Sequence, residues 1–441
     1  MPTLESLTER RLLDFMAGLD IIDCHEHLPP ERVRTDQPQD VFTLVSHYCR
    51  HDLFSAGLDR ETYCGMNVWG VTRPTYEALL NPAIPIEQRW AVFKPWWETI
   101  RHGSYARAAI LTAKLVYGVD GIRDDTYREL SARIAAENTP GVYRRMLCDR
   151  CRILAALTQC ARMDVEAPLV PIMPAGMLTD ITGREAVEKL AAGLGAAVPG
   201  DVEAYLQLTR RRLAAWADDG MVGLKFMSRR YAAPDAKAAA DAYGRLLDGQ
   251  ALTGEQRGAL QGHLVHAVLD QCGELGLVAA VHAGIWGDFR DLDCKHLLTL
   301  APAHPRTEFD LYHLGMPSVR DAIVVAKNLP NVWLNLCWTH IVSQVQTCSG
   351  IDELLDQVPV TKVLAFGGDY ARPVEKVVGH LQMAREDYAQ VFGRRIDRGR
   401  LDRADAEAIL TLWFRENPLR LYRRLRLPEP AGKVAAQATG G

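Results

Sequence analysis

Residues 19–27 read LDIIDCHEH, an apolar run that ends in two histidines separated by one residue. A short apolar run of this kind is typical of a strand in a parallel sheet buried on both faces. Seven more such runs follow along the chain, with helical patterns between them. The eight runs are residues 19–24, 151–157, 168–173, 221–226, 277–281, 309–312, 332–336 and 363–367. Eight strands that alternate with helices predict an α/β fold of the (β/α)8, or TIM-barrel, type.

The segments between the runs carry helix signals. Asp201 begins a helical pattern that ends at Gly220, and Pro373 begins one that ends at Gly393. Asp and Pro favour helix starts, and Gly favours helix ends. The connection between the first two runs is much longer, about 120 residues, and a connection of that length has structure of its own. We predict four parts: the first strand in residues 1–27, a helical insertion that caps the barrel in residues 28–150, the rest of the barrel in residues 151–427, and a disordered tail in residues 428–441.

The composition is that of an ordinary globular protein. Of 441 residues, 48% are hydrophobic and 24% are charged, and the net charge is -4. These values exclude a disordered chain and predict neither a nucleic-acid partner nor binding to a membrane. The amino-terminal segment lacks the continuous apolar stretch of a secretory signal. The ten cysteines are scattered, with Cys148 and Cys151 as the only close pair, which favours reduced thiols and a cytoplasmic location.

Polar residues stand at the carboxyl ends of four predicted strands. Residues two apart in a strand face the same side, so we expect His25 and His27 to point together. His282 ends the fifth run, His313 follows the sixth and Asp369 follows the eighth, each beside a glycine-bearing loop. Ligands bind at the carboxyl ends of barrel strands, and paired imidazoles suit Zn, Mn, Fe or Ni. The pattern therefore predicts a metal site.

This set of residues resembles the amidohydrolase superfamily, which carries His-x-His on the first strand, His on the fifth and sixth, and Asp on the eighth. The resemblance implies one divalent metal, zinc in preference to Mn, Fe or Ni, and its ligands would be His25, His27, His282 and Asp369. It also implies that Asp369 takes a proton from a metal-activated water. His313 would stabilise the developing oxyanion or donate a proton.

A narrower resemblance is to uronate isomerases, a non-hydrolytic branch that also carries a long helical insertion after the first strand. Residues 40–57 (DVFTLVSHYCRHDLFSAG) are similar to the start of that insertion, and residues 282–290 (HAGIWGDFR) to the fifth-strand motif. His313 is a departure, because the sixth strand of that branch does not normally show a histidine. The departure favours a hydrolase or a decarboxylase.

Four further residues are candidates for substrate contacts. Lys225 lies in the fourth run, where its amine suits a substrate carboxylate. The superfamily resemblance offers another role, a carboxylated lysine that bridges two metals, and a structural role is also open. Arg290 and Arg372 follow predicted ligands and either clamp a carboxylate or lie on the surface. Trp286 follows the fifth run and either lines an apolar wall or packs in the core.

Together these patterns predict a metal-dependent hydrolase that acts on a small, carboxylate-bearing amide, lactone or ester. The alternatives are metal-dependent decarboxylation, aldose–ketose isomerisation of a uronic acid, and a metal-binding barrel without catalysis. A structural zinc site closed by four ligands needs no fifth polar residue beside it, which weighs against the last alternative. We expect a small-molecule substrate and a homo-oligomer.

Overall fold

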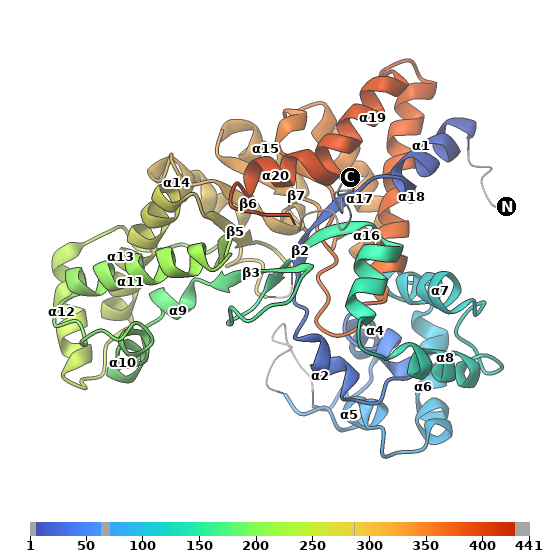
Figure 1. The fold of residues 1–441 in the computed structure, drawn as a ribbon, viewed down its shortest axis with the longest axis horizontal. Helices are drawn as coiled ribbons and strands as arrows, with labels where there is room; N and C mark the ends of the chain where they lie inside the picture. Colours follow the sequence, from blue (N-terminus) through green and yellow to red (C-terminus); the bar gives the residue numbers. More distant parts are fainter. Residues whose placement is uncertain (1–5, 63–70, 286, 428–441) are drawn as a thin grey trace, which may run out of the picture.

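The computed structural model describes residues 6–62, 71–285 and 287–427. Its centre is a parallel eight-stranded sheet in which each strand pairs with the next one in the sequence (Figure 1). The strands are β1 (Ile21–Glu26), β2 (Ile153–Gln159), β3 (Leu169–Pro174), β4 (Gly223–Met227), β5 (Val278–His282), β6 (Phe309–Leu311), β7 (Val332–Asn335) and β8 (Val363–Leu364). The predicted (β/α)8 barrel is confirmed, with all eight strands at the predicted runs.

The barrel closes where β1 meets the residues that follow β8. The Cys24 amide donates to the Phe366 carbonyl at 3.0 Å, and the His27 amide donates to the Tyr370 carbonyl at 3.1 Å. β8 itself is short, so the chain beyond Leu364 completes this side of the barrel in irregular conformation. The closing segment therefore runs directly beside the histidines of β1.

Helices flank the strands on all sides of the barrel (Figure 1). One of the two longest, α13, begins with a capping box between Thr253 and Gln256 and ends at Gly276, whose φ of 68° glycine adopts without strain. Among the described residues, no helix has the length and apolar character needed to span a membrane. Outside the first connection the helices and helical turns are α1 (Leu7–Ala17), α9 (Gly176–Thr179), α10 (Arg184–Ala192), α11 (Val202–Asp218), α12 (Ala236–Leu247), α13 (Gly254–Leu275), η2 (Cys294–His296), α14 (Leu297–Ala303), η3 (Tyr312–Gly315), α15 (Val319–Asn328), α16 (Thr339–Val342), α17 (Gln344–Leu355), η4 (Val360–Lys362), α18 (Lys376–Asp397), α19 (Arg403–Thr411), η5 (Leu412–Glu416) and α20 (Asn417–Leu421).

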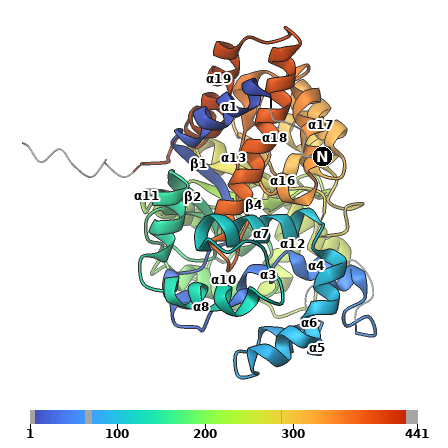
Figure 2. The ribbon, with the colours of Figure 1, turned by 90° about the vertical axis from the view of Figure 1, so that its right-hand side faces the viewer.

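The long connection between β1 and β2 is helical in the structure. Its helices gather on one side of the strands, away from the α9–α13 group and from α19 (Figures 1 and 2). They are α2 (Glu31–Thr35), α3 (Val41–Val45), α4 (Cys49–Ala56), α5 (Pro74–Leu80), α6 (Ile86–Ile100), α7 (Ser104–Tyr117), α8 (Tyr127–Glu137) and the π-helical turn η1 (Arg144–Arg150). α7 packs closely on α18, because a Cβ on Gly379 would lie only 2.3 Å from the carbonyl oxygen of Ala108.

The sequence predicted the boundaries of two helices. One of these predictions is confirmed and the other is wrong. The prediction at Asp201 is confirmed, since Asp201 caps α11 by accepting a hydrogen bond from the Ala204 amide at 2.8 Å. The helix predicted at Pro373 instead begins at Lys376, and it runs through Gly393 rather than ending there. Gly393 is needed for packing and not for termination, because a Cβ there would lie 2.8 Å from the Cγ of Glu9 on α1. The predicted tail, residues 428–441, lies outside the described residues.

A buried ion pair joins the helical connection to the barrel. Arg34 on α2 donates to the carboxylate of Glu375, the residue before α18, at 3.0 Å, and both side chains are almost completely buried. Tyr117 on α7 donates to the same carboxylate oxygen at 3.3 Å. Glu375 therefore fixes two helices of the connection against the segment that closes the barrel.

Glu375→Gln is expected to lower the free energy of unfolding by about 3–5 kcal/mol, because it leaves the Arg34 charge buried without a counter-charge. Urea denaturation measures the change. Glu353→Gln is the matched control, since Glu353 pairs on the surface with Arg320, whose side chain is 82% exposed, and exposed pairs add little stability. Equal losses in the two variants would contradict the structural role of the buried pair.

Candidate metal centre

His25 on β1 and His27, the residue directly after the strand, lie on the same side, as predicted from their spacing. Cys24 and Glu26 alternate with them along the strand. The two imidazole centroids are 5.0 Å apart. His25 is buried, with its ring centroid 4.2 Å from that of Tyr312, whereas the His27 side chain is 43% exposed. The strand thus offers one buried imidazole and one that reaches solvent.

Asp369 lies against this pair in the segment that closes the barrel. Its Oδ1 is 3.2 Å from Nε2 of His25 and 3.4 Å from Nε2 of His27. The backbone of Asp369 has a φ of 61°, a left-handed conformation that only a few per cent of non-glycine residues adopt and that is often found at functional sites. Two hydrogen bonds hold this conformation, from the Asp369 amide to the His25 carbonyl at 2.7 Å and from the Tyr48 hydroxyl to the Asp369 carbonyl.

These three side chains fit a divalent metal ion. One potential ligand atom from each of His25, His27 and Asp369 lies within 4.8 Å of the others. Nδ1 of His25 is buried and has no hydrogen-bond partner among the described residues. Two nitrogens and one carboxylate oxygen suit Zn, Mn or Fe. Three protein ligands also leave a coordination position open, as catalytic metal sites do.

His313 and His282 form a second pair next to this group. His313 follows β6, and its Nδ1 is 4.0 Å from Oδ2 of Asp369. Its Nε2 is 3.1 Å from Nδ1 of His282, whose own Nε2 is 3.1 Å from the carbonyl oxygen of Ile285. Burial lowers the pKa of His282 to about 3 and that of His313 well below its usual range. Both ring nitrogens of His282 are engaged, so the structure does not bring this predicted ligand into the group of three.

Two buried carboxyl groups support the backbone on either side of Asp369. Asp23 accepts hydrogen bonds from the His25 amide at 3.1 Å and from the Gly368 amide at 3.3 Å. Glu26 accepts one from the Tyr370 amide at 2.6 Å. Burial raises the pKa of Asp23 to about 7 and that of Glu26 well above its usual range. These groups bond β1 to the closing segment and so help to hold Asp369 against the histidines.

A family comparison agrees with this geometry. The family model described as Amidohydrolase matches residues 22–424. The chain belongs to the amidohydrolase family. The match includes every residue of the metal group and of the His282–His313 pair, and the metal group is of the kind on which this metal-dependent family relies. Among curated proteins, none matches the sequence.

Solved structures share the fold of this chain over nearly its whole length. A glucuronate isomerase from Caulobacter crescentus superposes with a TM-score of 0.75 at 19% identity, covering 96% of each chain. A uronate isomerase from Thermotoga maritima gives 0.73 at 16% identity, covering 94% of this chain and 97% of the other. A uronate isomerase from Bacillus halodurans gives 0.67 at 13% identity, covering 96% and 98%. At such low sequence identities, the similarity to these structures shows the fold alone.

Lys225 lies inside the barrel, on β4. Its Nζ is buried, has no hydrogen-bond partner among the described residues, and lies 4.1 Å from the ring centroid of Tyr312. Tyr312 in turn packs against His25, so the amine and the metal group share one aromatic neighbour. Burial lowers the pKa of Lys225 to about 8, with Asp369 as the main opposing charge. An amine buried in this way lacks the anionic partner that its charge requires.

The two arginines predicted to bind a carboxylate lie in different surroundings. Arg290 has a side chain that is 76% exposed and that binds the carboxylate of Asp288. Arg372 lines a cavity of about 550 Å³ together with Ser46 at the end of α3. The structure therefore does not bring the two guanidinium groups together. Trp286 lies outside the described residues.

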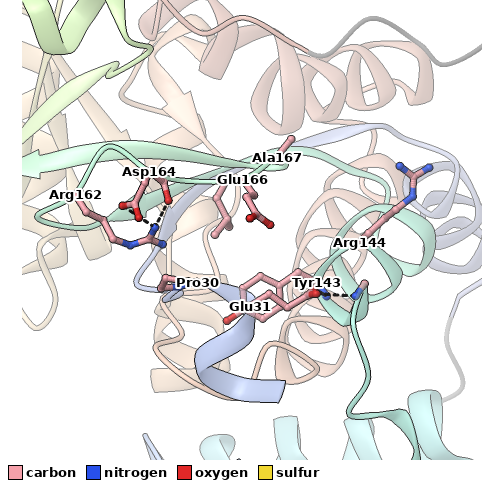
Figure 3. Close-up of a pocket in the computed structure, with 10 residues that line it drawn as sticks. Pro30, Glu31, Tyr143, Arg144, Arg162, Asp164, Glu166 and Ala167 are labelled. Atoms are coloured by element: carbon pink, nitrogen blue, oxygen red, sulfur yellow. Dashed lines mark hydrogen bonds and ion pairs between the residues drawn. The ribbon is translucent and has the colours of Figure 1, made fainter. Parts of the chain in front are cut away.

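A smaller cavity of about 160 Å³ lies between the start of α2, η1 and the β2–β3 loop (Figure 3). Three of the charged residues that line it already have partners. Arg162 binds Asp164, and Glu31 accepts a hydrogen bond from the Tyr143 amide at 2.8 Å. None of the candidate site residues lines this cavity.

Sequence reasoning gave no role to Tyr48, Asp23 or Glu26. The acidic residues were visible in DCHEH, with Asp23 two residues before His25 and Glu26 between the histidines. A carboxylate that interrupts a buried strand is a signal in itself because buried charges need partners. Tyr48 had no such signal. It binds Asp369 across a separation of 321 residues, and its position follows from the packing of the helical connection over the barrel.

Proposed function

We propose that this amidohydrolase uses one divalent metal ion to hydrolyse a small, carboxylate-bearing amide, lactone or ester. The observation that carries the proposal is the position of His313, whose Nδ1 lies 4.0 Å from Oδ2 of Asp369. The other oxygen of that carboxylate faces His25 and His27. One carboxylate thus lies between the metal group and a buried imidazole, which is the order in which a proton from an attacking water would travel, and the 4.0 Å contact would have to shorten to hydrogen-bond distance when substrate binds.

In this proposal His25, His27 and Asp369 hold the metal, which we propose to be zinc, with Mn, Fe or Ni as alternatives. When bound, such a metal lowers the pKa of water to about 7 and polarises a substrate carbonyl. Asp369 accepts the proton of the attacking water at Oδ2 and passes it to Nδ1 of His313. His313 then delivers the proton to the leaving group, so a poor leaving group departs in neutral form.

We propose that Lys225 binds the substrate carboxylate. Its buried Nζ lacks a partner among the described residues, and an anion beside it would restore the full charge of an amine whose pKa burial lowers to about 8. Arg372 is a second candidate for this role, because it lines a cavity and comes from the same segment as Asp369. A substrate held by Lys225 would have its carboxylate at β4 and its reacting carbonyl at the metal group of β1 and the segment that follows β8.

Lys225→Ala is expected to raise KM by about 10–100-fold, the range for losing a charge-assisted hydrogen bond, while the metal content stays unchanged. A panel of amides, lactones and esters with a carboxylate, each paired with its uncharged carboxamide analogue, measures the effect. Wild type should prefer the charged member of each pair, and the variant should lose that preference. Loss of about one metal equivalent would contradict the assignment and support a carboxylated Lys225 that bridges two metals.

Aldose–ketose isomerisation of a uronic acid is the second candidate function. It is favoured by the structures of glucuronate and uronate isomerases that share the fold over nearly the whole chain. Such a reaction needs a base that moves a proton between adjacent carbons, and it consumes no water. Asp369 is also the candidate base there, so the fate of water oxygen separates the two functions.

We further propose a homo-oligomer in the cytoplasm that acts on a small molecule. The nine cysteines that the structure describes are free thiols, which supports a reducing compartment. Size-exclusion chromatography with light scattering tests the oligomeric state.

A further inference from the structure

The hydrolytic scheme leaves one polar group of the site without a role, the thiol of Cys337. Cys337 follows β7 and is completely buried. Its Sγ lies 3.3 Å from Nδ1 of His313, which is hydrogen-bond distance for a thiol and an imidazole. Which of these two atoms donates a hydrogen bond to the other depends on which nitrogen of His313 carries the hydrogen.

The contact between His282 and the carbonyl of Ile285 determines which nitrogen of His313 carries the hydrogen. The carbonyl oxygen of Ile285 only accepts hydrogen bonds, so Nε2 of His282, 3.1 Å away, must carry the hydrogen. In a neutral ring, Nδ1 of His282 then has a lone pair. That lone pair faces Nε2 of His313 at 3.1 Å, so His313 must carry its hydrogen on Nε2. Nδ1 of His313 is therefore the unprotonated nitrogen.

Three polar groups of the described residues surround this unprotonated nitrogen. They are the carbonyl oxygen of Cys337 at 3.3 Å, the thiol of Cys337 at 3.3 Å and Oδ2 of Asp369 at 4.0 Å. The carboxylate oxygen, at 4.0 Å, lies beyond hydrogen-bond distance. Of the two groups within reach, the carbonyl oxygen only accepts hydrogen bonds, and the thiol has a hydrogen to donate. We propose that the Cys337 thiol donates to Nδ1 of His313 and thereby fixes the tautomers of His313 and His282 for proton transfer.

The backbone of Cys337 is held in place by a chain of hydrogen bonds that runs through β7 and β6. Its amide donates to Oδ1 of Asn335 at 2.9 Å, and the Asn335 side-chain amide donates to Asp310 at 3.0 Å. The hydroxyl of Tyr422 donates to the same carboxylate oxygen at 2.6 Å. Burial raises the pKa of Cys337 well above its usual range, so the sulfur keeps the hydrogen that it donates.

Without the thiol, the two possible tautomers of the pair become similar in energy. In the present tautomer, Nδ1 of His313 would face the Cys337 carbonyl with two lone pairs opposed. In the other tautomer, Nδ1–H of His313 would donate to that carbonyl, but Nε2 of His282 would then oppose the carbonyl of Ile285. The thiol removes the first conflict and leaves the second, so it selects one tautomer.

The tautomer assignment is independent of the proposed function. Only its consequence for proton transfer during turnover rests on that function. The lone pair on Nδ1 of His313, which the thiol releases when the proton arrives, is what allows the ring to receive the proton from Asp369. Cys337 is therefore a positioning residue, which acts through His313 and has no need to contact the substrate. The tautomer itself is a property of the protein and can be measured without any substrate.

The test is nitrogen-15 NMR of protein labelled in its histidine rings, where protonated and unprotonated nitrogens resonate far apart. His313→Asn and His282→Asn assign the signals. Wild type and Cys337→Ser, which keeps a donor, should show His313 protonated on Nε2 only. Cys337→Ala should show both tautomers, and kcat should fall with the competent fraction, by about 2–10-fold at unchanged KM. Cys272→Ala, a buried cysteine on α13, is the matched control and should resemble wild type.

A hydrogen on Nδ1 of His313 in wild type, or spectra of Cys337→Ala identical to those of wild type, would overturn the inference. Failure of the protein to hydrolyse any substrate would remove the kinetic consequence but leave the tautomer result intact. The two failures are therefore distinguishable.

Discussion

Replacing His25 and His27 together by alanine is expected to empty the metal site and to lower kcat by about 10³–10⁴-fold, the equivalent of several kcal/mol of lost metal stabilisation. The reason is that the two Nε2 atoms and Oδ1 of Asp369 converge on one point. Without the imidazoles a single carboxylate remains, which does not hold a transition metal at trace concentrations. Metal analysis of the purified variant by mass spectrometry, together with a rate assay, measures both effects.

His282→Asn is the control for this experiment, because both nitrogens of His282 face other partners in the structure. We expect this variant to retain its metal. Full metal occupancy in the double alanine variant would contradict the three-residue group. Loss of metal from His282→Asn would instead restore the four-ligand set that the superfamily resemblance implies.

His313→Asn is expected to lower kcat by about 10²–10⁴-fold with the metal content unchanged, because asparagine keeps a polar side chain but cannot carry a proton. The pH profile of kcat/KM should also change, since its limbs report the ionisation of coupled groups and His313 is one of them. His304→Asn provides a buried-histidine control, as His304 binds Asp270 in the outer helical layer. A rate within a few-fold of wild type would contradict the role of His313.

The fold was predictable because its signals are local. Each strand is a short apolar run, and the order of the runs is the order of the strands. The ends of α18 were less predictable. Gly393 resembles a helix terminator in sequence, and only the packing of α1 against it explains why the helix continues.

The proximity of His25, His27 and Asp369 was predictable, since strand period and barrel topology bring them to one end of the barrel, whereas their role as metal ligands was implied by the superfamily resemblance and stays a prediction. The orientation of His282 was not predictable, because it depends on the carbonyl of Ile285 and on the ring of His313. Contacts of this kind are fixed by loop conformation. The position of the Arg290 side chain was not predictable for the same reason, because Arg290 binds Asp288, a residue of the same loop.

The central claim is that the protein activates water for hydrolysis, and reaction in oxygen-18 water tests it most directly. If Asp369 takes a proton from an attacking water, mass spectrometry should find one labelled oxygen in the carboxylic acid product of each turnover. Isomerisation would give a different result. Interconversion of a uronic acid and its keto form, with solvent deuterium incorporated at carbon and no oxygen label gained in the course of turnover, would contradict the account.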